Sequence, residues 1–218
     1  MVMTEFLSYS ELVEQVPSTM REVRREATHM EALNVTGGNG QSYGYIVYRK
    51  EVVLRAGSTL VIRGHPRDLV QVMVNGVMVN PPLLHTMDLL RTFGSWGMRD
   101  AEFTFVDHVD GCEEFCTLDL MVENLGRANF GSPHNYEQKK GLWEGELVVD
   151  GEVMEDWEHV AMEMEPGWIA GLEGWRSYNR CRIAFNSITP FKHAFQDSGE
   201  PLWSEAHEGS SHYTRYFS

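Results

Sequence analysis

The chain has 218 residues, 42% of them hydrophobic and 23% charged, so it can bury a sizeable core and is neither disordered nor fibrous in composition. Its 18 Lys and Arg residues against 32 Asp and Glu residues give a net charge of -14, whereas nucleic acids and anionic membranes are bound through cationic side chains. We therefore expect no nucleic-acid partner and no membrane partner. No apolar run reaches the roughly 18 residues that a membrane helix needs, and the first residues lack the features of a signal peptide.

Residues 1–29 predict a connector rather than a domain. Ser10–Val16 has the spacing of a short helix, which ends at Pro17 because proline cannot continue it. Ser18–Ala27 predicts a second short helix with Ser18 as its N-cap. Both segments are polar and interrupted, so we expect no independent core in this part of the chain.

A glycine-rich loop, Thr36–Ser42, follows the connector. Its glycines leave the backbone unrestrained, and a strand rather than a helix is expected after it, so no helix N-terminus would face a phosphate group. Asn34 begins the sequence Asn-Val-Thr, which is the acceptor pattern for N-glycosylation. Asn34 is therefore a glycosylation candidate, provided that the protein is secreted.

From Tyr43 onward the apolar residues recur with a period of two, which is typical of β-strands. Asn75-Gly76 and Asp150-Gly151 predict two hairpins, because both dipeptides tolerate the positive φ angles of a type I′ turn. The strand candidates are Tyr43–Arg49, Glu51–Arg55, Thr59–Arg63, Leu69–Val74, Val77–Val79, Ala101–Val106, Thr117–Glu123, Glu146–Val149, Glu152–Met154 and Arg180–Ile188. We expect an all-β jelly roll or β-sandwich over residues 30–165 and a truncated second β domain over residues 166–218.

The sequence contains no known catalytic signature and no metal-binding motif. Its 9 histidines never lie two or four residues apart, so we expect no metal site and no cofactor. Glycoside hydrolysis needs two carboxylates, and Glu113-Glu114 and the pair Glu144 and Glu146 are close in sequence. Neighbouring residues of a strand point to opposite faces, which disfavours the first pair, and carboxylates beside a hairpin are typical of a solvated surface. We therefore assign no catalytic residue to this chain.

Three cysteines, Cys112, Cys116 and Cys181, cannot all pair within the chain. Cys112 and Cys116 lie close enough to form a local disulfide in an oxidising compartment, and reduced thiols are the equal alternative. Several aromatic residues could stack on sugar rings if they are exposed, although core packing is favoured for most of them. These aromatic residues are Tyr43, Tyr45, Trp143, Trp168 and Trp175.

One segment has a more particular sequence than a generic strand. Leu118–Gly131 reads Leu-Asp-Leu-Met-Val-Glu-Asn-Leu-Gly-Arg-Ala-Asn-Phe-Gly, and Lys140-Gly141-Leu142 and Glu155-Asp156-Trp157 follow it. This order resembles the first all-β domain of the family 35 β-galactosidases, which have Val-Glu-Asn-(Met/Leu)-Gly-Arg-x-Asn-(Tyr/Phe)-Gly, then Lys-Gly-(Leu/Ile), then a Trp. The resemblance covers about Met30 to Trp157 and includes the Asn-Gly hairpin.

The resemblance implies a galactose-binding-like jelly roll that accompanies a TIM-barrel catalytic domain with two glutamates, in a lysosomal or extracellular glycoprotein. The barrel has no counterpart in this chain, and the Gly-Arg-Tyr-Trp turn of the second β domain is missing after Trp175. We therefore expect the accessory β region of a β-galactosidase-like glycoside hydrolase of carbohydrate metabolism, which lacks hydrolytic residues of its own. The alternatives are a stand-alone carbohydrate-binding module that recognises galactosides, and an inactive truncated product.

The motif also has a physical interpretation. Asn124 and Asn129 can bond to their own backbone, and Arg127 can bond several carbonyls or a carboxylate at once. With Glu123 at the end of the strand, these residues predict a rigid corner that holds two strands and docks a neighbouring domain. This structural role is favoured over direct contact with sugar.

Overall fold

The computed structural model describes residues 2–81, 88, 92–106, 112, 114–128, 131, 136–142, 144–177 and 191–194. Its backbone forms two compact units: a main unit, Val16–Met164, and a terminal unit made of Met1–Gln15 with Glu165–Ser218. The predicted division at residues 29 and 165 stays a prediction. The strand predicted over Arg180–Ile188 lies outside the described residues, as does Cys181.

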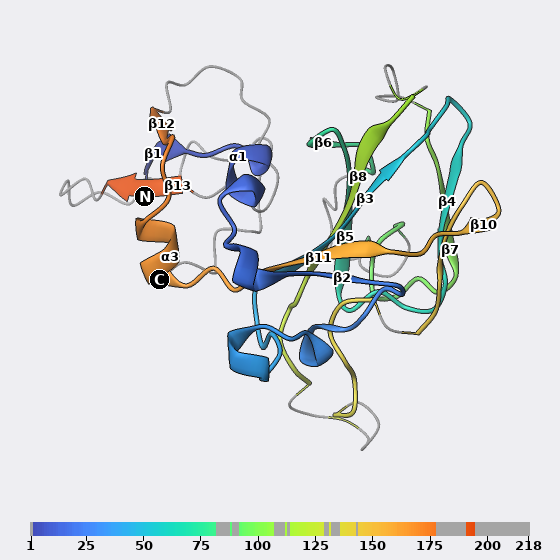
Figure 1. Ribbon diagram of the computed structural model, residues 1–218, viewed down its shortest axis with the longest axis horizontal. Coiled ribbons are helices and arrows are strands. Elements are labelled where there is room, and N and C mark those ends of the chain that lie inside the picture. The colour runs from blue at the N-terminus through green and yellow to red at the C-terminus, as the bar shows by residue number, and fades with distance from the viewer. Residues whose placement is uncertain are drawn as a thin grey trace. The chain divides into compact units, whose positions relative to one another are not determined.

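The main unit contains a six-stranded and a four-stranded antiparallel sheet (Figure 1). The larger sheet consists, in spatial order, of β2 (Arg21–Arg24), β11 (Trp157–Met162), β3 (Tyr45–Val52), β8 (Cys116–Glu123), β5 (Leu69–Val74) and β6 (Val77–Met78). The smaller sheet consists of β10 (Glu152–Val153), β9 (Leu147–Val149), β4 (Thr59–Ile62) and β7 (Ala101–Thr104). Short 3-10 helices lie at η1 (Ser18–Met20), η2 (Met30–Ala32) and η3 (Thr36–Gly38).

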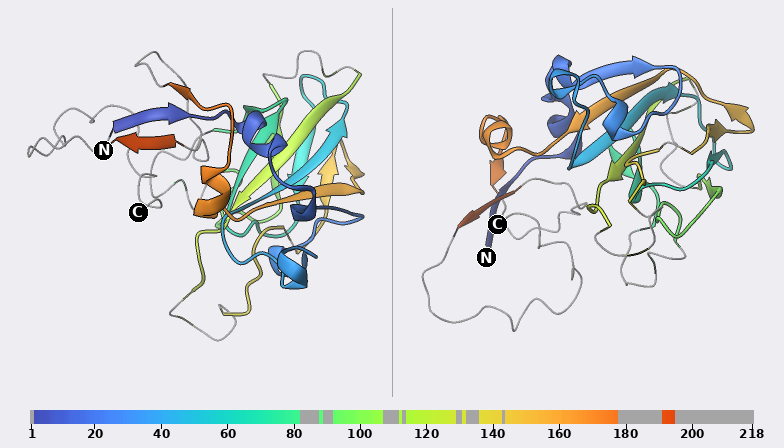
Figure 2. Two further views of the ribbon diagram at one scale, coloured as in Figure 1. Left: turned by 60° about the vertical axis from the view of Figure 1, so that its left-hand side comes forward. Right: turned by 90° about the horizontal axis from the view of Figure 1, so that it is seen from below.

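The hydrophobic core of the main unit takes side chains from both sheets. The larger sheet contributes Leu118, Leu120 and Val122 from β8, and the smaller sheet contributes Leu60 from β4 and Leu147 from β9. All five side chains are buried in one cluster, so the two sheets share a single apolar interior. The predicted all-β sandwich is confirmed, and β3, β8 and β5 lie side by side in its larger sheet (Figure 2).

Both predicted hairpins are confirmed. Asn75 and Gly76 join β5 to β6 with φ angles of 48° and 80°, and Asp150 and Gly151 join β9 to β10 with φ angles of 50° and 84°. Each turn also bonds to a neighbouring strand, since Asn75 Oδ1 accepts a hydrogen bond from the Thr117 amide at 3.0 Å and Asp150 Oδ1 accepts one from Thr59 at 2.7 Å. Turn residues whose type is readable from sequence therefore also anchor the sandwich.

The helix predicted over Ser18–Ala27 is wrong. After the single turn of η1, the chain forms strand β2, which pairs with β11. In this pairing Arg21 lies opposite Val160 and Arg24 lies opposite Trp157. An unpaired edge of β11 would leave its backbone polar groups without partners, so strand pairing overrides the helical spacing. The ion pair of Arg21 with Glu158, at 2.9 Å, adds to the contact between the strands.

One further expectation changes in the larger sheet. The candidates Tyr43–Arg49 and Glu51–Arg55 form one strand, β3, which ends at Val52. In β8, Asp119 is buried, with 1% of its surface exposed, and it accepts two hydrogen bonds from Arg49, at 2.7 and 2.8 Å. A bidentate Arg–carboxylate pair of this kind satisfies the buried charge.

Cys112 and Cys116 are joined by a disulfide, and their Cα atoms are 4.9 Å apart. The bond ties the first residue of β8 to a segment whose carbonyl, that of Cys112, accepts a hydrogen bond from the Leu54 amide at 3.2 Å. Of the two alternatives that the sequence leaves open for these thiols, the structure therefore contains the disulfide.

The terminal unit contains a three-stranded sheet with the order β12 (Arg176–Ser177), β1 (Val2–Phe6) and β13 (Phe191–Ala194). It also holds the helices α1 (Tyr9–Glu14) and α3 (Pro166–Ala170). The helix predicted near Ser10–Val16 is confirmed by α1, which Ser8 caps. No helix in the described part of the chain combines the length and the apolar character that a membrane span requires.

Candidate functional site

The motif at the end of β8 leads into a group of polar residues that we call the polar corner. The polar corner is defined by Glu31, Asp68, Glu123, Asn124, Arg127 and Lys140. These residues come from η2, from the segment before β5, from the end of β8 and from the segment before Leu142. Segments that are distant in sequence therefore meet at one place in the main unit.

A buried ion pair lies at the centre of the polar corner. Lys140, whose side chain is 3% exposed, donates to both carboxylate oxygens of Asp68, at 2.9 and 2.8 Å. Asp68 Oδ2 also accepts a hydrogen bond from the Leu125 amide at 2.7 Å, so it fixes the first residues after β8. A buried charge pair is tolerated only with such additional hydrogen bonds, and loss of either partner leaves a costly unpaired charge.

Glu123 is the last residue of β8 and is 7% exposed. Its Oε1 accepts a long hydrogen bond from the Tyr45 hydroxyl at 3.4 Å, while its Oε2 is buried without a hydrogen bond to any residue that the structure describes. Burial is the main cause that raises the pKa of Glu123 to about 7; the Tyr45 hydrogen bond opposes this rise and the negative charge of Asp68 contributes to it. The side chain therefore changes its protonation state near neutral pH.

Asn124 shapes the turn that leaves β8. Its Oδ1 accepts a hydrogen bond from the Gly126 amide at 2.9 Å, which is an Asx turn, and its Nδ2 donates to the Ser42 carbonyl at 3.0 Å. Its backbone amide donates to Gly44 at 3.1 Å. Asn124 thus bonds both to its own turn and to the segment that enters β3.

Arg127 bridges two other segments. Its guanidinium forms an ion pair with Glu31 and donates to the Gln138 carbonyl at 3.0 Å. Burial alone would raise the pKa of Glu31, but its own backbone amide, the Lys140 amide and Arg127 together hold that pKa below its usual value. These contacts, to a carboxylate and a carbonyl, are of the kind expected of Arg127, while its docking role stays a prediction.

The other residues predicted from sequence lie in various environments. Asn129, like Glu113 and Trp143, is outside the described residues. Asn34 is exposed, and its backbone amide donates to Glu22 at 3.2 Å, so its glycosylation stays a prediction. Glu146 is exposed, whereas the Glu144 side chain is only 22% exposed and approaches two arginines.

The aromatic candidates for sugar stacking also differ in how exposed they are. Tyr45 is buried, as core packing requires, whereas Tyr43 is 48% exposed. Trp168 and Trp175 are partly buried, and the Trp175 indole donates to the Leu172 carbonyl at 2.8 Å. Trp96, which no sequence pattern singled out, is 42% exposed.

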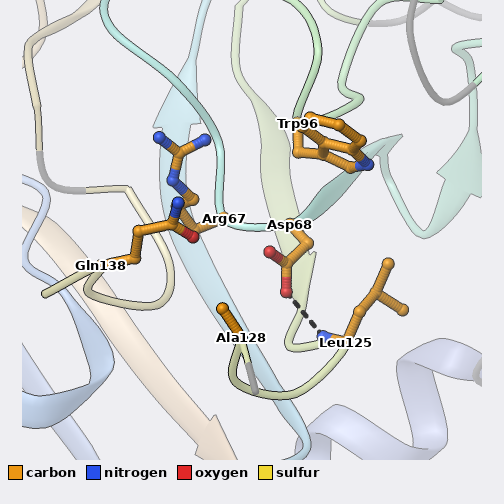
Figure 3. A pocket seen from close by; sticks show the side chains of 6 residues that line it. All are labelled: Arg67, Asp68, Trp96, Leu125, Ala128 and Gln138. Carbon is orange, nitrogen blue, oxygen red and sulfur yellow. Dashed lines mark hydrogen bonds between the residues drawn. The ribbon is translucent and has the colours of Figure 1, made fainter. Parts of the chain in front are cut away.

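A hollow of about 310 Å³ lies beside the polar corner. Arg67, Asp68, Trp96, Leu125, Ala128 and Gln138 line it (Figure 3). These residues come from four separate stretches of the chain and follow no spacing, so no signal in the sequence could have assembled them. Asp68 is the one carboxylate among the described lining residues, and no cluster of metal-ligating side chains occurs in the part of the chain that the structure describes.

Comparison with known proteins places this geometry in context. Residues 98–163 match the family model described as "Beta-galactosidase, first all-beta domain". The chain is 30% identical over 151 residues to human beta-galactosidase-1-like protein 2, an alignment that covers 68% of this chain and 20% of the relative. It is 28% identical over 148 residues to human beta-galactosidase-1-like protein 3, which covers 68% of this chain and 19% of that relative. The chain therefore spans about a fifth of the length of these relatives.

Proposed function

Because this chain belongs to the β-galactosidase-like proteins of family 35 through their first all-β domain, we propose that it supports a catalytic barrel rather than performing hydrolysis. The partner in this proposal is the TIM-barrel domain of a full-length β-galactosidase-like glycoside hydrolase. In this proposal the protein takes part in carbohydrate metabolism. The observation that carries the proposal is the polar corner, in which Lys140 bonds to Asp68, Arg127 bonds to Glu31, and a fixed turn follows β8.

The polar corner suits a docking surface because it is rigid on its inner side and polar on its outer side. Asp68 and Lys140 are buried and satisfied, so the backbone of Leu125 is held in one position. Arg127, whose side chain is 46% exposed, and Asn124 lie on the turn that this ion pair fixes. Because these polar groups are already fixed, less conformational entropy is lost when a partner binds to them.

The charges of the hollow favour support over catalysis. Hydrolysis by the usual glycosidase mechanism needs two carboxylates that face one glycosidic bond. Asp68 is the one carboxylate among the lining residues that the structure describes, and Lys140 and the Leu125 amide already occupy its two oxygens. An acid that is neutralised in this way cannot serve as nucleophile or proton donor.

We place the protein in an oxidising compartment, either the lysosome or the extracellular space. The Cys112–Cys116 disulfide supports this, because such bonds persist mainly outside the cytosol. The exposed Asn34 in its Asn-Val-Thr sequence is accessible to glycosylation in the secretory pathway.

Two measurements test the support role. The purified chain should leave a chromogenic β-galactoside intact, and it should co-purify with the remainder of human beta-galactosidase-1-like protein 2 when the two are co-expressed. Arg127→Ala should weaken co-purification, whereas Arg25→Ala, a change at a guanidinium that is 73% exposed and pairs with Glu155, should not. Hydrolysis by the chain alone, or an Arg127→Ala variant that folds and co-purifies like the parent, would contradict the proposal.

A further inference from the structure

The hollow beside the polar corner presents an aromatic wall opposite polar side chains. In Figure 3 the Trp96 ring stands on one side, and Arg67 and Gln138 stand on the other, with Asp68 and Ala128 between them. The backbone that precedes Trp96 is fixed, since the Val70 amide donates to the Gly94 carbonyl at 2.7 Å and Ser95 forms a bridge to Leu69. At Gly94, with φ at 84°, a Cβ would overlap the Val70 carbonyl, so the approach of this segment requires glycine.

The polar wall carries groups whose hydrogen-bonding capacity is not used. The Arg67 side chain is 12% exposed, and its Nε is buried without a hydrogen-bond partner in the described structure. Its Nη2 lies 3.9 Å from the Glu144 carboxylate, which is beyond hydrogen-bond distance. The Gln138 carbonyl accepts from Arg127, but its side-chain amide makes no hydrogen bond with any described residue. A buried N–H without a partner is costly, and a bound acceptor would remove that cost.

The backbone around Arg67 is nevertheless well fixed. Its amide donates to the Gly141 carbonyl at 3.1 Å, and the Gly141 amide donates to the Arg67 carbonyl at 2.7 Å. The side chain therefore starts from a rigid position, and its open Nε results from the arrangement of the wall rather than from a loose segment.

The charges around the hollow are balanced, which indicates an uncharged ligand. The carboxylate of Asp68 is neutralised by Lys140 at 2.8 Å, and the Arg67 guanidinium faces Glu144. An anionic or cationic ligand would have to displace one of these pairings or enter without a counter-charge. A neutral ligand with many hydroxyl groups can bind without displacing an ion pair and without a counter-charge.

We infer that the hollow binds a single neutral sugar ring, with the Trp96 indole against its C–H face. Ring or hydroxyl oxygens accept hydrogen bonds from Arg67 Nε and the Gln138 amide, and the Gln138 side-chain oxygen accepts one from a sugar hydroxyl. The volume of about 310 Å³ is at the lower end of the range for small-molecule sites, about 300–1,000 Å³, and so favours one ring over an extended chain. This inference goes beyond the support role and does not depend on it.

Indole ¹⁵N NMR of the full chain tests the inference. The Trp96 indole signal, identified by its loss in Trp96→Phe, should shift saturably on titration with galactose and with lactose at millimolar concentrations. Galactose alone represents a free monosaccharide, and lactose represents the terminal residue of a longer glycan. Equal shifts would assign the site to the terminal ring, and a shift with galactose alone would restrict it to the free sugar.

Matched variants separate sugar contact from a change of fold. Trp96→Leu and Gln138→Ala should each weaken binding about tenfold or more, as measured for both variants and the parent by calorimetric titration, because Trp96→Leu lacks the indole signal. Phe115→Ala removes an aromatic ring that is 69% exposed but does not line the hollow, so it should leave binding unchanged. Since the Gln138 side chain makes no internal hydrogen bond with described residues, Gln138→Ala should fold normally.

Three outcomes overturn the inference: no saturable shift with either sugar, equal binding by the folded Trp96→Leu and Gln138→Ala variants, or tighter binding of glucuronate than of galactose. The last result would indicate an anion site. None of these outcomes bears on co-purification with the catalytic partner, so failure of the sugar site and failure of the support role are distinguishable.

Discussion

Asp68 belongs both to the polar corner and to the hollow beside it, and the two regions treat their polar groups differently. In the polar corner, Lys140 and the Leu125 amide occupy both oxygens of Asp68, so the charge of Asp68 is paired and hydrogen-bonded. In the hollow, neither the buried Arg67 Nε nor the Gln138 side-chain amide makes a hydrogen bond with a described residue. A buried cluster whose polar groups are all hydrogen-bonded stabilises the fold. A ligand gains the most binding free energy where it supplies hydrogen bonds that buried polar groups lack. The comparison predicts that breaking the Asp68–Lys140 ion pair reduces stability and that substitutions in the hollow reduce binding.

The largest effect should come from Lys140→Met. The substitution leaves the Asp68 carboxylate buried with one backbone hydrogen bond, and breaking a buried ion pair in this way costs about 3–5 kcal/mol. The free energy of unfolding, measured by urea titration at neutral pH, should fall by that amount. Arg25→Met, at an exposed ion pair with Glu155, is the control and should change the free energy little. Similar small effects for both variants would show that the polar corner does not stabilise the fold.

A smaller, pH-dependent effect should come from Glu123→Gln. The pKa of Glu123 is raised by burial to about 7 in the folded chain, from 4.5, so the folded state holds this proton more tightly than the unfolded state. This contribution to stability is complete below pH 4.5 and is lost as the pH rises through about 7, by about 3 kcal/mol at most. Glu123→Gln cannot ionise, so its stability should exceed that of the parent above neutral pH and should not show this loss.

His159 changes the stability with pH in the opposite direction to Glu123, so its effect has to be separated from that of Glu123. Burial lowers the pKa of His159 to about 4, so its protonation opposes folding as the pH falls from its ordinary value towards 4. The His159 ring already accepts a hydrogen bond from the Thr28 amide at 3.0 Å and bonds the Trp157 carbonyl at 3.0 Å, as a neutral imidazole does. Urea titrations from pH 4 to pH 8 on the parent and Glu123→Gln therefore isolate the Glu123 contribution as the difference between the two curves. Parallel curves would contradict the raised pKa.

The smallest change in stability should come from Gln138→Ala. Its side-chain amide is not bonded to described residues, so the free energy of unfolding should stay within about 0.5 kcal/mol of the parent. The same variant should lose sugar binding about tenfold in the NMR titration. A large loss of stability would place Gln138 in the polar corner rather than in the hollow.

The features that could be predicted from sequence depend on neighbouring residues. The hairpins at Asn75-Gly76 and Asp150-Gly151 follow from the φ angles that those residues tolerate, and the Asx turn at Asn124 follows from the reach of one short side chain. Strand β2 was missed because its pairing with β11 joins residues more than a hundred positions apart. For the same reason, the burial of Asp119 could not be seen without Arg49 of β3.

By itself the sequence determined the all-β class, the hairpins and the relation to β-galactosidase-like proteins, because alternating apolar residues, turn residues and a motif are local properties of the chain. The tertiary structure decided which charges are buried and which donors stay open. Lys140 reaches Asp68, Arg127 reaches Glu31, and Trp96 comes to face Arg67, because the sheets bring together segments that are distant in sequence. Burial sets the free energy of each of these polar groups, and burial exists only once the chain has folded.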